Sequence, residues 1–304
     1  MRACAWAVAA SSAAALLGRL PFFELATHFR LQYALAAAAC AGWLAWSRAW
    51  LTFALAAACA ALNGSYVLPF YTRARAARPP GGEERLVLMF ANVYAGNEDY
   101  NALLASVAEV RPDVLALAEV TPAWASQLGA LGREYPYYSL LPRPGGSGLA
   151  LFSRLPLEGP EGLDIDASTH PVMRARVLLP RASLSLLVMH PPTPMRPDKL
   201  AQRAAQFRRA DELLGPEPRA LVGDLNVTPW SPYFRELLAL ARLRDAREGA
   251  GLVPTWPSPL PAFLRIPIDH CLVSESVEVL SVRAGPRTGS DHLPLVVELG
   301  LPAR

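Results

Sequence analysis

The sequence predicts an α/β protein in which two packed β-sheets are flanked by helices, preceded by transmembrane helices at the N-terminus. Apolar residues concentrate at one end, because residues 1–71 carry only five charged side chains although 18% of the 304 residues are charged. Beyond this region, short apolar runs of strand length outnumber helical patterns and do not alternate strictly with them, which favours two packed sheets over one parallel sheet. We therefore divide the chain into a hydrophobic anchor (1–71), a linker (72–84) and one large domain (85–304).

Three uncharged apolar stretches form the anchor, at residues 3–18, 31–47 and 49–71. A membrane-spanning helix needs about 20 apolar residues, with a range of roughly 17–25. The third stretch meets this length, and the second reaches its lower limit and carries two tryptophans near one end, as interfacial segments do. The first is either a transmembrane helix or a signal peptide, because Arg2 precedes its apolar core and small residues follow. We expect two or three transmembrane helices.

The side of the membrane on which the domain lies follows from the number of spans. Three spans with the N-terminus inside place the domain outside the cytoplasm, and a cleaved signal followed by two spans does the same. The distribution of positive charge disagrees, since cytoplasmic loops normally hold the excess of arginine and lysine. In this topology Arg2 and Arg48 lie inside, and Arg19, Arg30, Arg73, Arg75 and Arg78 lie outside. We expect an extracytoplasmic domain, with the charge count against it.

Charge and cysteine content limit the function of the domain. Of the 29 Lys+Arg and 26 Asp+Glu, four and one precede Tyr71, so the rest of the chain carries 25 of each and is formally neutral. Proteins that grip a nucleic-acid backbone usually have a basic excess. Cys271 is the one cysteine of the domain, which excludes an internal disulfide framework and a zinc site built from cysteines. The linker 72–84 (TRARAARPPGGEE) is basic and then rich in proline and glycine, as juxtamembrane linkers are.

Apolar runs predict the strands of the domain, and apolar residues at helical spacing predict its helices. Strands are expected at 85–91, 114–120, 150–153, 173–179, 184–189, 220–223, 270–273, 277–282 and 295–299, and helices at 100–110, 198–214 and 233–241.

Polar side chains stand where many of these strands end. They are Asn92, Glu119, His190, Asp224, Asn226, Asp269, Asp291 and His292. Each alone has an ordinary structural explanation as a turn former, a solvated acid, a packed loop histidine or a strand cap. Together, strand ends that converge at one edge form a pocket. Oxygen ligands without thiolates suit Mg²⁺ or Mn²⁺, and a hard cation with acid/base side chains suits hydrolysis of a phosphate ester.

Six motifs carry a family resemblance. They are FANV with Asn92, PDVLALAEV with Glu119, VMHPP with His190, GDLN with Asp224 and Asn226, PIDH with Asp269, and GSDH with Asp291 and His292. On these motifs, residues 85–299 resemble the endonuclease/exonuclease/phosphatase superfamily, whose fold is a four-layered α/β sandwich. The apolar N-terminus, with PFFELATHFRLQY, TWP and RIPIDH, is similar to a bacterial membrane-bound branch. The resemblance implies a multi-pass protein of the bacterial cell membrane.

The resemblance also implies the metal-binding residues. Glu119 is the expected principal Mg²⁺ ligand, Asn92 assists it, and Asp291 lies beside the metal. Tyr94 departs from the family pattern, because some members carry an acidic residue at this position. A second metal contact is therefore not expected at Tyr94, and the choice between one and two ions stays open.

The remaining site residues are expected to act on water and phosphate. The resemblance implies that Asp224 positions or deprotonates the attacking water and that Asn226 donates to a phosphoryl oxygen. It implies that His292 contacts the scissile phosphate and is oriented by Asp269. His190 is expected to stabilise the charge that develops on the phosphorane.

Three functions are compatible with these residues. The favoured one is a membrane-anchored phosphoesterase that cleaves a phosphate ester, phosphodiester or pyrophosphate bond of a lipid or lipid-linked substrate, because the chain has an anchor and a neutral domain. The alternative is a membrane-tethered nuclease, with a groove lined by Arg174, Arg176, Arg203, Arg208 and Arg209. A non-enzymatic membrane scaffold is disfavoured, because no catalytic position is missing. The expected partners are the lipid bilayer and a phosphate-containing substrate, with nucleic acid not favoured; the oligomeric state stays open.

Overall fold

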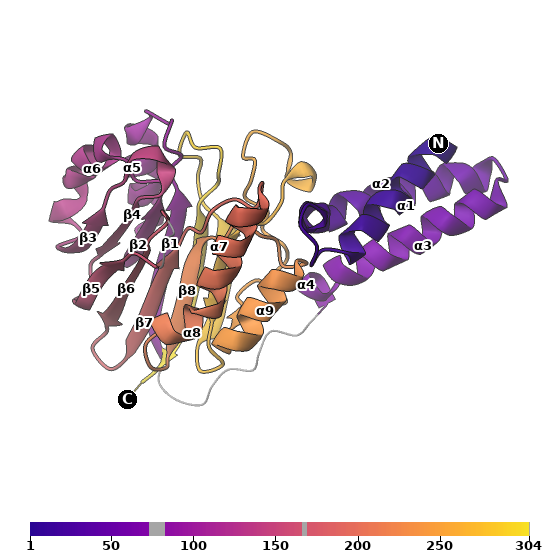
Figure 1. Cartoon of the computed structure of the whole chain (residues 1–304). Helices are drawn as coiled ribbons and strands as arrows, with labels where there is room; N and C mark the ends of the chain where they lie inside the picture. Colours follow the sequence, from indigo (N-terminus) through magenta and orange to yellow (C-terminus); the bar gives the residue numbers. More distant parts are fainter. Residues whose placement is uncertain (73–82, 166–168, 304) are drawn as a thin grey trace.

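The computed structural model describes residues 1–72, 83–165 and 169–303, and most of the predicted linker 72–84 lies outside these residues. Figure 1 shows a bundle of N-terminal helices that extends from one side of an α/β sandwich. The sandwich contains two mixed six-stranded sheets with helices on both outer faces. The predicted α/β class with two packed, helix-flanked sheets is confirmed.

The N-terminal helices lie where the apolar stretches predict them. They are α1 (Arg2–Leu16), α2 (Arg30–Trp46) and α3 (Trp50–Val67), with the 3₁₀ segment η1 (Phe23–Phe29) between the first two and the short α4 (Pro69–Thr72) at the end. Helices α2 and α3 form an antiparallel hairpin (Figure 1). By length and composition, α3 is the one helix among the described residues that could cross a membrane. Membrane insertion of α1 and α2, which are shorter, stays a prediction.

The first sheet contains the two ends of the domain. Its strand order is β11-β12-β1-β2-β4-β3. The strands are β1 (Glu83–Asn92), β2 (Val114–Ala118), β3 (Tyr137–Leu141), β4 (Leu149–Ser153), β11 (Glu278–Ala284) and β12 (Leu295–Pro302). Strands β1 and β2 are parallel and the other pairs are antiparallel. Helices α5 (Tyr100–Val110) and α6 (Pro122–Leu128) cover its outer face.

The second sheet has the order β5-β6-β7-β8-β10-β9. Its strands are β5 (Leu157–Leu163), β6 (Val172–Leu178), β7 (Ser183–Met189), β8 (Arg219–Asp224), β9 (Arg244–Asp245) and β10 (Asp269–Val273). Strands β7 and β8 are parallel, and β10 is antiparallel to β8. Helices α7 (Pro197–Arg208), α8 (Ala210–Leu213) and α9 (Pro232–Ala241) cover its outer face. Three short 3₁₀ turns, η2 (Gly129–Arg133), η3 (Pro144–Gly146) and η4 (Ala262–Leu264), lie in loops.

Strand β1 explains how the layers hold together. Leu86, Leu88 and Phe90 point into the space between the two sheets, while Met89 and Ala91 pack under the outer helices. Successive residues of a strand point to opposite faces, so a strand covered on both faces is apolar throughout. Burying one such large side chain contributes about 1.5–3 kcal/mol. The continuous apolar runs of the sequence are therefore the central strands of a four-layered structure.

The structure corrects the sequence prediction at the edges. The helix expected at 198–214 is interrupted at Arg209, which separates α7 from α8. Strands β3, β5 and β9 were not predicted. β3 and β5 are edge strands with largely exposed or half-buried residues, and β9 has two residues. β5 (LEGPEGL) contains glycine and proline, which an edge strand tolerates because one side of its backbone is unpaired.

The N-terminal helices pack on the sandwich through a small apolar cluster. Val67 and Phe70, at the end of the bundle, contact Trp230 and Leu252. The Trp230 indole N–H donates to the Tyr66 carbonyl over 3.0 Å. The two parts therefore share a buried contact, and the bundle extends from one side of the sandwich (Figure 1).

Candidate active site

Strand direction and register bring the predicted site residues to one end of the sandwich. Parallel pairing places Asn92, at the end of β1, opposite Ala118, so Glu119 follows directly beside it. Antiparallel pairing places Asp269, at the start of β10, opposite Asp224, at the end of β8. A side chain at Gly223 would collide with the Met189 carbonyl, so glycine lets β8 lie against β7 where the predicted site residues begin. The motifs therefore meet because the parallel strand pairs β1/β2 and β7/β8 end at the same edge of the sandwich.

Three site segments turn through left-handed backbone. The φ angles of Tyr94, Glu119 and Asn226 are 58°, 63° and 51°. Asparagine adopts this region readily, whereas other residues with side chains rarely do. Such conformations persist when the surrounding structure holds them in place, and they concentrate at functional sites.

Asn92 connects the acidic residues of the two sheets. Its amide nitrogen donates to Glu119 Oε1 over 2.9 Å and to Asp224 Oδ2 over 3.1 Å. Its amide oxygen accepts from the Tyr94 backbone over 2.9 Å. Glu119 Oε2 accepts from the Ala95 backbone over 2.9 Å. Because both polar groups of Asn92 are used, this residue orients Glu119 and Asp224 within the site.

His292 and Asp269 form the pair expected from the sequence. His292 Nδ1 and Asp269 Oδ2 lie 2.9 Å apart in a buried hydrogen bond, and His292 Nε2 lies 3.6 Å from Asp224 Oδ2. Burial alone favours the neutral imidazole, but the charges of Asp269 and Asp224 outweigh it and raise the pKa of His292 to about 10. Burial also raises the pKa of Asp224. The His292 ring is therefore a charged donor at neutral pH.

His270, beside Asp269 in the sequence, has a different role. Its Nε2 lies 2.7 Å from the Val227 carbonyl, and Arg247 contacts its other ring nitrogen. Burial lowers the pKa of His270 well below its usual value. This histidine holds the turn after β8 in place and does not line the site cavity.

His190 and Asn226 complete the predicted set. His190 Nε2 lies 3.6 Å from Asp224 Oδ2 and 4.0 Å from Glu119 Oε1. Its Nδ1 is buried and has no hydrogen-bond partner among the described residues. Asn226 donates one amide hydrogen to the Pro191 carbonyl over 3.0 Å, and its backbone N–H donates to Asp224 Oδ1 over 2.9 Å. Both side chains line the same cavity.

Asp291 lies at the rim of the site, held by Trp256. The Trp256 indole N–H donates to Asp291 Oδ2 over 3.0 Å. Ser290 fixes the same loop, because its hydroxyl donates to the Asn92 carbonyl over 2.8 Å and accepts from the His292 backbone over 3.0 Å. All eight predicted residues thus lie in one connected cluster or on its rim.

Several residues of the cavity were not predicted. The cavity has a volume of about 680 Å³, and η1 supplies Leu25, His28 and Phe29 to its lining. Within η1, Glu24 is buried and forms an ion pair with Arg203 of α7 at 2.8 Å. Arg203 also donates to the Asn226 carbonyl. One signal could have indicated this segment, since Glu24 is the single acidic residue before Tyr71, and an isolated charge in an apolar region often has a function.

The remaining unpredicted lining residues come from the sandwich. They include Tyr94, His170, Lys199, Trp256, Ile266 and Ile268. The rings of His170 and His190 meet edge to face at 5.9 Å. Burial and the neighbouring His190 lower the pKa of His170 to about 4. His170 is therefore a neutral side chain of the cavity wall at neutral pH.

The arginines suggested for a nucleic-acid groove are engaged in other contacts. Arg174 pairs with Glu161, Arg176 donates to Ser183, Arg203 pairs with Glu24, Arg208 with Glu236 and Arg209 with Glu212. Arg203 is buried, and none of the five lines the cavity. The suggested basic groove is therefore not part of the cavity lining.

The donor set fits a hard divalent cation. Glu119, Asp224 and Asp291 line the cavity with a single lysine, Lys199. One oxygen of Asp269 is buried without a hydrogen-bond partner among the described residues. Single ligand atoms of Asp224, Asp269 and His292 also lie within 4.8 Å of one another, but this group does not include the expected ligands Glu119 and Asp291, and Asp269 already holds His292. Carboxylate oxygens in excess over cations suit Mg²⁺ or Mn²⁺.

Two helix-flanked sheets with an acidic and imidazole site at one end define a metal-dependent hydrolase of phosphoric esters. A model of the "Endonuclease/Exonuclease/phosphatase family" matches residues 89–292, and the chain belongs to this family. No curated protein sequence matches the chain.

Solved structures share the fold at low sequence identity. TDP2 from D. rerio, in complex with a single-strand DNA product, is 18% identical, with a TM-score of 0.60 over 71% of this chain and 99% of that one. An endonuclease/exonuclease/phosphatase from Beutenbergia cavernae is 20% identical, with a TM-score of 0.58 over 72% of each chain. A Bacteroides thetaiotaomicron member is 17% identical, with a TM-score of 0.56 over 73% and 96%.

Proposed function

We propose that this chain is a membrane-anchored, Mg²⁺- or Mn²⁺-dependent phosphoesterase of the bacterial cell membrane. It hydrolyses a phosphate ester, phosphodiester or pyrophosphate bond of a lipid or lipid-linked substrate, with its catalytic domain outside the cytoplasm. One observation carries the proposal. The segment η1, which joins the apolar helices α1 and α2, lines the catalytic cavity with Leu25, His28 and Phe29. The site therefore opens where the helices meet the sandwich.

The surface of the helices supports an anchor. Helix α3 has 18 residues, about 27 Å at 1.5 Å per residue, close to the hydrocarbon thickness of about 30 Å. Large aromatic side chains are exposed near both ends of the bundle. Those far from the sandwich are Trp6, Trp43, Trp46 and Trp50, and those near it are Phe22, Phe23, Phe29 and Tyr71. Aromatic residues at two levels are typical of membrane interfaces.

The chemistry follows from how the carboxylates are held. Glu119 and Asp291 are the proposed metal ligands, and Asn92 orients Glu119. A bound Mg²⁺ supplies positive charge that stabilises the phosphoryl oxygens and the leaving group. Asp224 lies between Asn92 and the two histidines, so its carboxylate orients the attacking water and accepts its proton. The raised pKa of Asp224 makes it a better proton acceptor than an exposed aspartate.

The imidazoles and the amide act on the phosphoryl group. The charged His292 donates through Nε2, because Asp269 holds its Nδ1 hydrogen. Asn226 keeps one amide hydrogen for a phosphoryl oxygen after it has bonded Pro191. His190, beside Asp224 and Glu119, donates to the charge that develops in the transition state.

A nuclease is the second candidate. TDP2 from D. rerio, which has a similar fold, is in complex with a single-strand DNA product. The engaged arginines and the formally neutral domain favour the lipid substrate over nucleic acid.

A hydrolysis screen distinguishes the two candidates. The full-length chain in nanodiscs with Mg²⁺ is given phospholipids, isoprenyl pyrophosphates or plasmid DNA in separate reactions, and Asp224→Asn is the inactive control. We expect the wild type to release product from a lipid substrate and the variant to release none. Cleavage of plasmid DNA with no lipid hydrolysed would replace the proposal with the nuclease.

Fractionation tests the location. We expect the chain to stay in bacterial membranes during alkaline carbonate washing, and we expect protease added to spheroplasts to cleave the catalytic domain. Release by carbonate contradicts the anchor, and protection from protease reverses the orientation.

A further inference from the structure

The catalytic cavity is larger than a phosphate group requires, and its lining has two chemically different parts. Its volume of about 680 Å³ is in the range of pockets that enclose whole organic ligands, about 300–1,000 Å³. One part is the acidic and imidazole cluster. The other is apolar, and this apolar wall consists of Leu25, Phe29, Pro192, Pro194, Met195 and Ile266. The cavity therefore suits a ligand with a phosphate at one end and hydrocarbon at the other.

The apolar wall begins directly beside the catalytic residues. Pro192 follows His190 by two positions, and Ile268, which also lines the cavity, immediately precedes Asp269. A phosphate held by the catalytic cluster thus has its ester substituent next to hydrocarbon surface. Apolar contact with this surface favours a chain joined directly to the phosphate.

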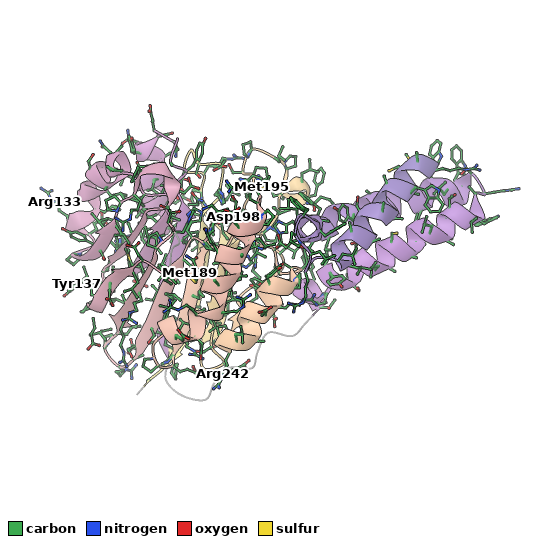
Figure 2. All side chains as sticks on the ribbon, viewed as in Figure 1. Arg133, Tyr137, Met189, Met195, Asp198 and Arg242 are labelled. Carbon is green, nitrogen blue, oxygen red and sulfur yellow. The ribbon has the colours of Figure 1, made fainter. Side chains whose placement is uncertain are left out.

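The apolar wall faces the N-terminal helices. Figure 2 shows Met195 on the side of the sandwich nearest the helix bundle. On the same side, Gln32 of α2 donates to the carbonyls of Phe263 and Arg265 over 3.1 and 3.0 Å. Phe263 and Leu264 are exposed there. A hydrocarbon chain that leaves the cavity in this direction reaches apolar side chains of the junction instead of open water.

The part of the wall formed by η1 is fixed to the catalytic domain. Glu24 Oε1 accepts from Arg203 over 2.8 Å and from the Ser231 hydroxyl over 2.9 Å, and both donors belong to the sandwich. Leu25 follows Glu24 directly and Phe29 is the last residue of η1, so both are held in place before a ligand binds. A preformed wall reduces the ordering cost of binding.

We propose that this apolar wall is the binding site for the hydrocarbon chain of the substrate, with Phe29 and Met195 as specificity-determining residues. The inference rests on the proposed function and names its substrate class, phosphates esterified directly to a long alkyl or isoprenoid chain. The N-terminal segment then has two functions, since it belongs to the anchor and to the substrate site.

Binding of a non-hydrolysable series tests the wall. The full-length chain in nanodiscs with Mg²⁺ is titrated calorimetrically with methyl-, butyl-, hexyl- and octylphosphonate, and empty nanodiscs correct for partitioning. Each methylene buried contributes about 0.8 kcal/mol, so Kd should fall about fourfold per methylene until the wall is covered. Phe29→Ala and Met195→Ala should each weaken octylphosphonate binding, by roughly tenfold for Phe29→Ala, and leave methylphosphonate binding unchanged.

Phe22→Ala is the matched control. Phe22 is an exposed phenylalanine next to η1 that does not line the cavity. Its truncation should therefore leave the Kd values for octylphosphonate and methylphosphonate unchanged. Phe29 and Met195 are 40% and 64% exposed, so their truncation should preserve the melting temperature. A Kd independent of chain length, no phosphonate binding, or unchanged chain dependence in both variants overturns the inference.

The binding test needs no turnover, so its failure is distinct from failure of the proposed function. If lipids are hydrolysed but phosphonate binding does not depend on chain length, the apolar wall does not bind the hydrocarbon chain and the proposed function stands. If phosphonate binding depends on chain length but no lipid is hydrolysed, the wall binds hydrocarbon and the proposed function is wrong.

Discussion

Glu24 and Arg203 form an ion pair at 2.8 Å in which both side chains are buried, and it joins the N-terminal segment to the catalytic site. The same glutamate oxygen accepts from Ser231 over 2.9 Å and lies 3.2 Å from His28 Nε2. Arg203 also donates a hydrogen bond to the carbonyl of Asn226, a residue of the site. Removing one partner of a buried pair leaves the other charge uncompensated, which costs about 3–5 kcal/mol.

Glu24→Gln should destabilise the protein in a pH-dependent manner. Although burial alone favours the protonated acid, His28 and Arg203 outweigh it and lower the pKa of Glu24 from 4.5 to about 2. A lowered folded-state pKa gives stability that is complete above pH 4.5 and is lost as pH falls toward 2, worth about 3 kcal/mol. At pH 7 the variant should melt roughly 5–10 °C lower. The difference from wild type should shrink below pH 4.5.

Glu236→Gln is the control for this measurement. Glu236 also connects the two parts of the chain, through Arg19 at 3.0 Å, but this pair is open to solvent, with side chains 67% and 29% exposed. An exposed pair contributes about 0–1 kcal/mol, so the melting temperature should change little. Equal effects of both substitutions, or a Glu24→Gln deficit that does not depend on pH, contradict the assignment.

Asp269 and His292 should act as one unit in catalysis. Asp269 holds the Nδ1 hydrogen of His292 over 2.9 Å, so loss of Asp269 misplaces the donor to the phosphate and loss of His292 removes it. Asp269→Ala and His292→Ala should each lower kcat by about 10²-fold or more. The double variant should lose little beyond the worse single variant, because groups that act together are not additive. Losses that multiply in steady-state kinetics indicate independent roles.

Glu119→Gln should raise the Mg²⁺ concentration needed for half-maximal activity. The amide loses the negative charge that attracts the cation, and its NH2 group cannot accept one of the two hydrogen bonds that Glu119 receives from Asn92 and Ala95. Loss of a residue that only supports metal ligands lowers metal affinity about 10–100-fold, so we expect at least that change, with a loss of stability of about 1 kcal/mol. EDTA should abolish wild-type activity and Mg²⁺ or Mn²⁺ should restore it. Glu134→Gln, a surface substitution beside Arg154, should need the same Mg²⁺ concentration as the wild type. If Glu119→Gln also has the wild-type Mg²⁺ dependence, Glu119 is not a metal ligand.

Trp256→Phe should impair the site through Asp291. The variant loses the indole hydrogen bond of 3.0 Å that orients this carboxylate, and loss of such support typically costs about 10–100-fold in metal affinity or activity. Trp230→Phe is a matched control, because it loses a similar bond to the Tyr66 carbonyl outside the site. Each variant should lose about 1 kcal/mol of stability, but only Trp256→Phe should change the Mg²⁺ titration. Equal titrations show that Asp291 does not need this support.

The central strands and the site could be predicted because their signals are local. Strands covered on both faces are continuous apolar runs, as LVLMFA before Asn92 illustrates. Asn92, Glu119, His190 and Asp224 stand where the parallel strands of each sheet end, and Asp269, Asp291 and His292 stand at or before the start of antiparallel strands that begin at the same edge. The pairing of Asp269 with Asp224 was not predictable, since it follows from a register set by the whole sheet.

The edge strands and the wall of the cavity could not be predicted for a different reason. β5 contains glycine and proline and is mostly exposed, so it lacks an apolar signal. Glu24 and Arg203 are separated by 179 positions in the sequence, and a local sequence pattern cannot predict a contact over such a separation. From the sequence we predicted only an anchor for residues 1–71, whereas in the structure Leu25 and Phe29 of this region line the cavity.

The position of β12 has a consequence for biosynthesis. This strand, the last one of the domain, lies between β11 and β1 and pairs with β1 from Glu83 to Phe90. While the ribosome is still adding the preceding residues, β1 lacks one of its two neighbours and the first sheet has an open edge. Contacts between distant parts of a sequence form slowly, and unpaired strand edges promote aggregation. The first sheet therefore has an unpaired edge, open to aggregation, until β12 has been synthesised. A chain that ends before Leu295 keeps β1 as an exposed edge.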